Sequence, residues 1–155
     1  MQQFKALELA ITQATRQRDD LARQTAQAHR VLDHAKGQLS QLQSYATDTD
    51  ARWIGGNAIN LSVELVKHHY QFMDRLQNAV QMQFGVIANL ERQLAAAQQR
   101  QLQAEYRLVG FQQVLKSRRA ALQVQQARRE QRVTDEFAAQ RHRRGRALQP
   151  MEEPS

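Results

Sequence analysis

The chain has 155 residues and no cysteine, and its 22 basic and 15 acidic side chains give a net charge of +7. The missing cysteines exclude a disulfide scaffold and a thiolate metal site. With 26 glutamines, nine aromatic residues and a mean hydropathy of −0.72, the chain has too few large apolar residues for the core of a compact domain. Its dominant residues, Ala, Leu, Gln, Arg and Glu, are good helix formers, and this mixture is typical of a long helix or a coiled coil.

Residues 1–50 are predicted to form the first helix. Thirteen positions in this segment are spaced alternately three and four apart, and 11 of them are apolar. This spacing is a heptad repeat, which indicates the seam of a coiled coil. The positions are Phe4, Leu7, Ile11, Ala14, Arg18, Leu21, Thr25, Ala28, Leu32, Ala35, Leu39, Leu42 and Ala46.

Residues 51–62 are predicted to form a turn. The residues just before this segment include Ser44, Thr47 and Asp50, which favour caps and turns over helix interiors. Within the segment, Gly55 and Gly56 can adopt positive φ at little cost. A heptad-bearing helix needs a packing partner in water, so we expect the following segment to fold back onto the first helix.

Residues 63–146 are predicted to form a second, longer helix. Its seam has 16 positions, 12 of them apolar, although Gly85 and Gly110 fall within the helix and should each destabilise it by about 1 kcal/mol relative to Ala. The positions are His69, Met73, Leu76, Val80, Gln83, Ile87, Leu90, Leu94, Ala97, Gln101, Ala104, Leu108, Phe111, Leu115, Arg118 and Leu122.

The predicted fold class is therefore all-α: two long helices forming an antiparallel coiled-coil hairpin within one elongated domain, residues 1–155. A fold centred near Asn57 pairs Leu42 with Phe72 and places Phe4 near Gly110. The second helix then extends past the first by roughly 35 residues, or about 50 Å. Residues 147–155 contain both prolines and are predicted to be a disordered tail.

The positive charge is concentrated in the second helix. Residues 116–146 carry ten basic and three acidic side chains, whereas residues 1–115 carry 12 basic and ten acidic ones. Such a helix could bind phosphates or dock onto an acidic protein surface, or it could simply be a solvated helix face. Only Phe137 supplies an aromatic ring there, and no zipper follows a clean basic region, so nucleic-acid binding is disfavoured.

No pattern indicates catalysis, a metal or a cofactor. His29 and His34 are five residues apart and point to different helix faces, and at most one of His68 and His69 can face the seam. The carboxylate pairs at 19–20 and 135–136 are expected on solvated helix faces, because a two-helix rod has no concave interior for an active site. No signal-peptide core and no apolar run of about 18 residues is present, so we expect a soluble cytoplasmic protein.

Four of the nine aromatic residues, Tyr45, Trp53, Tyr70 and Phe72, are predicted to lie near the end of the hairpin. A coiled coil built from Ala and Leu does not need them for packing. Exposed aromatic residues at such a place favour a partner-binding patch, with capping of the turn by Trp53 as the alternative.

Three segments resemble the FliJ family, a small coiled-coil component of the bacterial flagellar type III export apparatus. They are "ALELA" with the heptads after it, "QLSQLQSY" from Gln38 with "YQFMDRLQNAVQ" from Tyr70, and "EQRVTDEFAAQ" from Glu130. The last resembles a family segment in which Lys is common at the position of Arg132. The resemblance covers nearly the whole chain.

The resemblance implies an antiparallel two-helix coiled coil, similar to the central stalk of rotary ATPases, with no enzymatic activity. It implies binding to the hexameric export ATPase, to the linker of the export-gate membrane protein and to export chaperones, at the cytoplasmic face of the inner membrane. The implied gate-binding residues are Gln38, Leu42, Tyr45, Phe72, Leu76 and Ala79. The implied ATPase-binding end comprises the turns from Phe4 to Ile11 and the arm from Gln126 to Arg144, in particular Arg128, Arg129, Gln131, Arg132, Asp135, Glu136 and Phe137.

The functional prediction is thus a stalk that promotes assembly and activity of the flagellar export ATPase and binds no small-molecule substrate. The equivalent stalk of a virulence type III secretion system is the nearest alternative. A coiled coil that binds nucleic acid through residues 116–146 is the alternative from another class.

Overall fold

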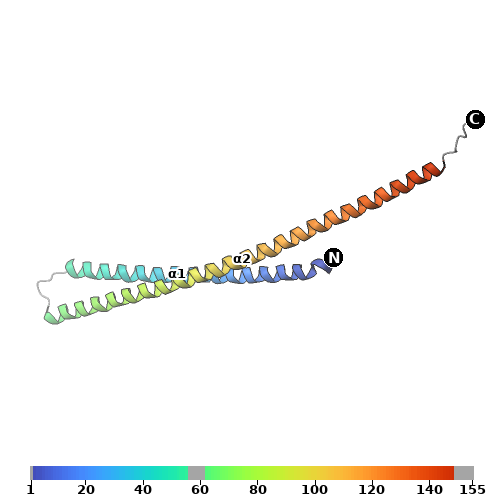
Figure 1. The fold of residues 1–155 in the computed structure, drawn as a ribbon. Helices are drawn as coiled ribbons and strands as arrows, with labels where there is room; N and C mark the ends of the chain where they lie inside the picture. Colours follow the sequence, from blue (N-terminus) through green and yellow to red (C-terminus); the bar gives the residue numbers. More distant parts are fainter. Residues whose placement is uncertain (1, 56–61, 149–155) are drawn as a thin grey trace, which may run out of the picture. The chain divides into compact units, whose positions relative to one another are not determined.

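The computed structural model describes residues 2–55 and 62–148, and nearly all of them are helical (Figure 1). A short 3-10 helix, η1 (Gln2–Phe4), leads into α1 (Lys5–Gly55), and α2 (Val63–Ala147) follows. The helices have 51 and 85 residues. The prediction of two long helices in contact, the second longer, is confirmed.

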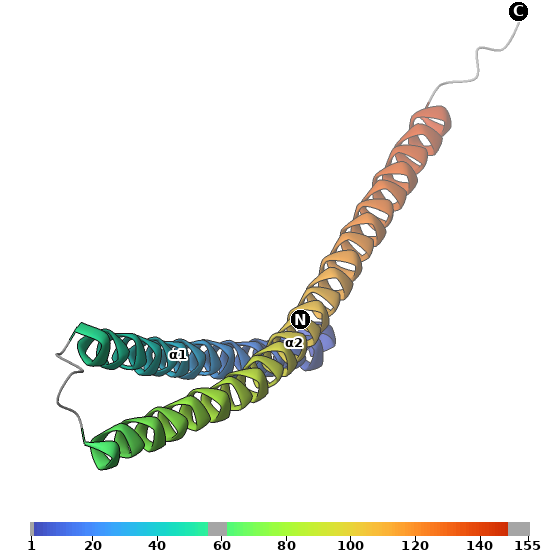
Figure 2. The same cartoon turned by 90° about the vertical axis from the view of Figure 1, so that its left-hand side faces the viewer.

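Contacts between the helices divide the chain into two compact units. One unit comprises Thr12–Leu108, in which α1 and α2 pack along each other in opposite directions (Figure 2). The other combines Met1–Ile11 with Val109–Ser155, so the first turns of α1 pack against the second half of α2. We call them the hairpin unit and the terminal unit, and describe each by itself.

The predicted seams are confirmed. All 13 seam positions of the first helix, and 15 of the 16 on the second, are buried or partly buried, and only Arg118 is exposed. In the hairpin unit, Leu32 and Ala35 of α1 form a buried cluster with Ile87 and Leu94 of α2. Two helices can enclose only this narrow strip. Ala, which occupies many seam positions, is small enough to let the two backbones approach closely.

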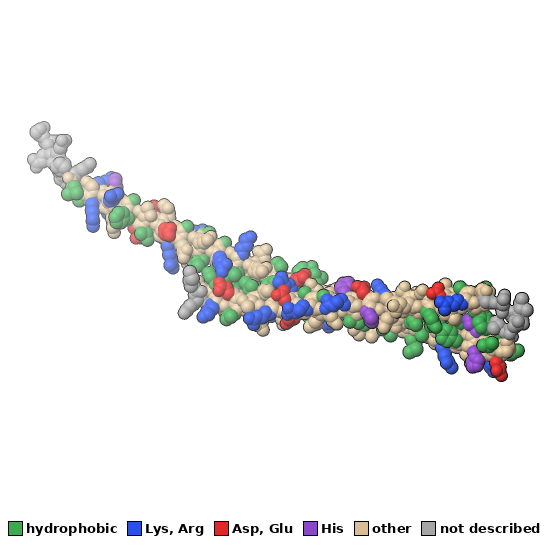
Figure 3. All heavy atoms as spheres, turned by 180° about the vertical axis from the view of Figure 1, so that it is seen from behind, with side chains coloured by type: hydrophobic (Ala, Val, Ile, Leu, Met, Phe, Trp, Pro, Cys, Tyr) green, Lys and Arg blue, Asp and Glu red, His purple; other side chains and the backbone are tan. Residues whose placement is uncertain are grey.

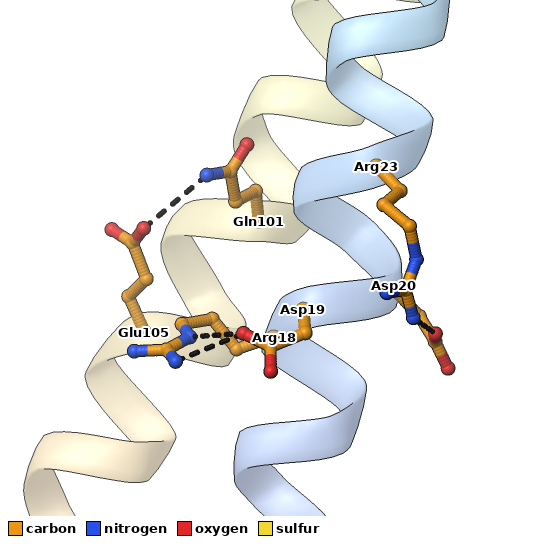
Figure 4. Close-up of polar contacts among 6 residues, drawn as sticks. All are labelled: Arg18, Asp19, Asp20, Arg23, Gln101 and Glu105. Atoms are coloured by element: carbon orange, nitrogen blue, oxygen red, sulfur yellow. Dashed lines mark hydrogen bonds and ion pairs between the residues drawn. The ribbon is translucent and has the colours of Figure 1, made fainter.

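Polar residues in the seam of the hairpin unit have hydrogen-bond partners. Buried Thr25 donates its hydroxyl to the carbonyl of Leu21, 3.0 Å away. Arg18 donates to the carboxylate of its neighbour Asp19, and Gln101 donates to Glu105, as Figure 4 shows. No buried side-chain nitrogen or oxygen among the described residues lacks a partner. The polar seam positions therefore leave no unpaired buried group.

The register of the helices differs from the predicted one. Phe72 was expected opposite Leu42, but its ring lies edge-on to that of Tyr45, with ring centroids 6.0 Å apart. In the terminal unit, Phe4 lies under the guanidinium of Arg119, not near Gly110. The predicted register is wrong because repeated Ala and Leu seams match almost equally well after a shift of one turn or more.

The side chain of Gln83 makes two hydrogen bonds that fit the observed register and not a shifted one. The side-chain amide of Gln83 on α2 donates to the backbone carbonyl of Ala35 on α1 at 2.8 Å and to the side-chain oxygen of Gln38 at 3.3 Å. A sliding of the helices by one turn would break both hydrogen bonds. A polar residue in an otherwise apolar seam commonly specifies register in this way.

The helix ends near the turn are well defined. α1 continues through Gly55, five residues into the segment predicted as turn, and the hydroxyl of Thr47 bonds back to the carbonyl of Gln43. Such bonds satisfy polar side chains inside a helix. Ser62 caps α2, since its hydroxyl accepts a hydrogen bond from the backbone N–H of Leu65 at 3.3 Å. The rest of the predicted turn, 56–61, and most of the predicted tail, 149–155, lie outside the described residues.

Candidate interaction surfaces

The residues expected to bind the export gate lie along one edge of the hairpin unit, but they differ in accessibility. Gln38, Tyr45 and Phe72 are exposed, and Tyr45 and Phe72 touch edge to face. Leu42 and Ala79 are partly buried, whereas Leu76 is only 8% exposed and packs in the seam. The structure therefore makes Leu76 a support for the surface and leaves the others accessible.

A shallow groove runs across this edge. It is lined by Gln38, Gln41, Leu42, Tyr45 and Gln83. Gln83, which joins the two helices, forms part of its wall. The groove thus contains three of the six predicted gate residues, and its lining combines apolar side chains with amide groups.

The same edge extends beyond the predicted patch. On α2, Leu65, Phe72, Ala79 and Val86 are seven residues apart, a spacing that keeps them on one side of the helix. Leu65, Phe72 and Val86 are exposed. Hydrophobic side chains gather on the surface at this end of the hairpin unit in Figure 3.

Sequence reasoning missed a second groove in the hairpin unit. It is lined by Arg23, Gln24, Gln27, Ala28, Arg30, Val31, Leu90 and Gln93. Val31 precedes Gln38 by seven residues, so the heptad that carries Gln38 and Tyr45 on α1 could have indicated it. The accessible edge is therefore longer than the motif-based patch.

Trp53 and His69 form a stacked pair at the end of the hairpin unit. Their rings are parallel, with centroids 4.0 Å apart, and an oxygen of Asp50 lies 4.0 Å from the imidazole Nε2. His69 occupies the seam and His68 is exposed, as expected from their adjacency. Tyr70 is exposed and lies edge-on to His69. Trp53 therefore packs against α2, while Tyr45, Tyr70 and Phe72 remain accessible.

In the terminal unit, the first turns of the chain contact α2 through a hydrogen bond and a cation–π interaction. Glu8 accepts a hydrogen bond from Arg119 at 2.9 Å, and Arg119 also lies over the ring of Phe4. Phe4 shares a groove with Leu122 and Gln125. The N-terminal turns therefore reach as far along α2 as about residue 125.

Close to this point α2 becomes exposed all round. Every residue from 123 to 148 is exposed, including all seven residues expected to contact the ATPase: Arg128, Arg129, Gln131, Arg132, Asp135, Glu136 and Phe137. Gln131 donates to Asp135 at 3.1 Å. We call residues 123–148 the basic arm. The structure does not gather the seven residues into a pocket; it presents them around a single helix.

Neither a metal site nor a membrane span is found in the described part of the chain. No group of three or more His, Asp or Glu side chains there could hold a metal ion. None of the described helices contains a stretch long and apolar enough to cross a bilayer.

Two helices joined along an Ala-rich seam, with an apolar edge on one unit and an exposed basic helix on the other, define a coiled-coil interaction protein. The sequence pattern of the flagellar FliJ protein family matches residues 3–147. The chain therefore belongs to the FliJ family and is a non-enzymatic component of the flagellar export apparatus, associated with the flagellar base. No curated protein and no solved structure matches it.

Proposed function

We propose that this protein acts as a central stalk of the flagellar export ATPase, at the cytoplasmic face of the inner membrane. In this role it enters the hexameric ring, promotes ring assembly and ATP hydrolysis, and connects the ring to the export gate and to export chaperones. Family membership supports a role in the flagellar export apparatus. The exposed basic arm supports the contact with the ATPase, and the apolar edge of the hairpin unit supports the contact with the gate.

The observation that carries the ATPase contact is the exposure of the basic arm. Its seven arginines, from Arg128 to Arg146, are all exposed. Charge on an exposed helix favours fast, oriented docking onto an acidic protein surface. The N-terminal turns lie in the same terminal unit, so both segments implied by the resemblance belong to one compact body.

The mechanism that we propose is assembly linkage. If the protein binds the assembled hexamer more tightly than the separate subunits, it shifts the subunits toward the ring that hydrolyses ATP. No active site on this chain is required for such stimulation.

For the gate, the apolar edge of the hairpin unit is the proposed contact. Tyr45 and Phe72 offer adjoining exposed rings, and Leu42 lies in the groove beside Tyr45. Clustered aromatic residues beside a groove are typical of the residues that dominate binding energy in protein interfaces.

Two alternatives lose support. The family match is to the flagellar protein, which favours the flagellar apparatus over a virulence secretion system. For nucleic acid, the arm supplies arginines but only one aromatic residue, Phe137. Strongly salt-dependent DNA binding near physiological salt would nevertheless favour a nucleic-acid role.

The decisive experiment measures ATP hydrolysis by the cognate export ATPase, with and without this protein, over a range of ATPase concentrations. We expect stimulation to be largest when the ATPase is dilute, since assembly is then limiting. Deletion of residues 126–155 should abolish the stimulation. An unchanged hydrolysis rate at every concentration, or full stimulation by the truncated chain, would refute the proposal.

A further inference from the structure

The groove around Val31 takes no part in the contacts proposed above. It lies in the hairpin unit, and it shares no residue with the groove at the gate surface or with the basic arm. Its apolar lining consists of Ala28, Val31 and Leu90. Ala28 and Leu90 pack against the buried cluster of the hairpin unit and are held in place by it, whereas Val31 is 39% exposed. The groove therefore offers a firm apolar surface to a partner.

The polar part of the lining is positive: it contains two arginines, Arg23 and Arg30, three glutamines and no carboxylate. Arg30 donates to the side-chain oxygen of Gln27 at 2.8 Å, and among the described residues no carboxylate lies within 4.0 Å of its guanidinium. Arg23 pairs with Asp20, one turn away on α1, as Figure 4 shows. Exposed pairs of this kind contribute little to stability. Both guanidinium groups can therefore turn toward carboxylates of a partner.

Positive charge continues along α2 on the side of the groove. Arg100 and Arg107 follow Gln93, which lines the groove, by seven and 14 residues, and each of the three directly precedes a seam position. This spacing keeps them on one edge of the seam. Glu91 and Glu105 each directly follow a seam position, which places them on the opposite edge. The groove thus lies on the edge of α2 that carries arginines, and the carboxylates lie on the other.

We propose that this groove binds an acidic amphipathic helix of a partner protein. In this arrangement the apolar side of the partner helix packs on Ala28, Val31 and Leu90, as a third helix laid against two. Its Asp and Glu side chains accept hydrogen bonds from Arg23 and Arg30. Docking of the apolar side of a helix into a groove is a common mode of recognition. A hydrogen bond from a guanidinium to a carboxylate is also stronger than the one that Arg30 makes with a neutral amide.

The lining favours an acidic protein helix over two other occupants. In a two-fold pair of this chain the same groove would face itself, so Arg23 and Arg30 would meet like charges. A nucleic acid would use the arginines, but the lining has no aromatic ring on which a base could stack, and Val31 would have no role. The proposal does not rest on the stalk function, because neither the basic arm nor the gate surface takes part in the contact.

The test measures binding of a designed fluorescent peptide to the full chain by fluorescence anisotropy. The peptide is a helix of about 18 residues, or roughly 27 Å, with Leu at every third and fourth position and Glu beside them. Two control peptides carry Ser in place of Leu or Gln in place of Glu. Salt near the physiological concentration screens diffuse attraction to the basic arm. We expect saturable binding of the acidic amphipathic peptide and binding about tenfold weaker for either control.

Variants of the chain locate the contact. Arg23→Gln together with Arg30→Gln should weaken peptide binding about tenfold, the combined effect of two exposed ion pairs. The matched control, Lys36→Gln together with Arg92→Gln, removes the same charge from exposed residues outside the groove and should have little effect. Val31→Ser should weaken binding several-fold, because it removes an apolar contact. Gln keeps helix propensity, and circular dichroism checks that every variant folds.

Absence of saturable binding by the intact chain would overturn the proposal. So would an equal loss in the two double variants, which would indicate diffuse charge attraction. Binding that survives Val31→Ser but is lost in Leu42→Ala with Phe72→Ala would place the peptide on the gate surface. Self-association of the chain that Val31→Ser abolishes would identify a second copy as the occupant, and tighter binding of duplex DNA than of the peptide would identify a nucleic acid. No ATPase or gate protein is present in the assay, so its result is independent of the stalk proposal.

Discussion

The indole ring of Trp53 lies parallel to the imidazole ring of His69, with an interplanar angle of 2°. This pair joins the last turn of α1 to the first turns of α2, next to the segment that connects the helices. The stack therefore fastens the end of the hairpin unit where seam packing is thinnest.

Replacing His69 with Ala should lower the free energy of unfolding by about 1 kcal/mol, because stacked ring pairs contribute roughly that much beyond area burial. It should also change the emission of Trp53, the single tryptophan of the chain. Thermal unfolding followed by circular dichroism and fluorescence measures both. The control is His68→Ala, since His68 is exposed. Equal effects of the two substitutions would show that the stack contributes nothing.

Replacing Gln83 with Ala should cost about 1 kcal/mol, the usual net contribution of a hydrogen bond, and should loosen the register. A spin label on each helix would report the register as a distribution of distances, which should broaden in the variant. Gln81→Ala removes an exposed amide from the same helix and should change neither quantity. A narrow, unchanged distribution in Gln83→Ala would mean that apolar packing alone sets the register.

Replacing Gly85 or Gly110 with Ala should stabilise the protein by about 1 kcal/mol each. Both glycines are helical, and a Cβ added at either would meet no atom within 4 Å outside its chain neighbours and the adjoining backbone of α2, so the gain in helix propensity is not offset by crowding. Chemical denaturation measures the change. A decrease in stability at either site would reveal a packing or conformational requirement that the open surroundings do not show.

Within the proposed gate surface, Leu42→Ala together with Phe72→Ala should weaken binding to the gate linker and reduce motility, with ATPase stimulation nearly intact. Leu76→Ala should instead lower stability by about 2–5 kcal/mol, because it leaves a cavity in the seam. Calorimetric titration with the linker, thermal unfolding and the ATPase assay separate these effects. Simultaneous loss of gate binding and stimulation in the double variant would indicate that the surface is structural.

The heptad spacing was sufficient to predict which residues are buried, since a helix places every third and fourth residue on one side. It could not predict the register, because a shifted Ala and Leu seam buries nearly the same residues. The hydrogen bonds of Gln83 to Ala35 and Gln38 depend on three-dimensional placement that spacing alone does not contain. Likewise, Ser44 to Asp50 looked like a helix end because such residues favour caps and turns. In α1 the hydroxyl of Thr47 instead bonds to the carbonyl of Gln43, which residue type alone does not predict.

Motif resemblance named Tyr45 and Phe72, which are exposed, together with Leu76, which is buried, since a motif does not separate an exposed residue from one that packs in the seam. It also omitted the groove around Val31, which lies outside the matched segments. The basic arm was predictable as a charged helix, while its exposure from residue 123 onward required the observed position of the N-terminal turns.

The seam of the hairpin unit has no deep interior: among the described residues, no large side chain is less than 2% exposed. The packing of each seam residue thus involves only neighbours within about one turn, because the two helices share no common core. In such an arrangement, local opening costs only the contacts of that segment, and the remaining turns stay paired. A partner that binds the apolar edge could part the helices there briefly, and the paired turns on either side would close them again on release.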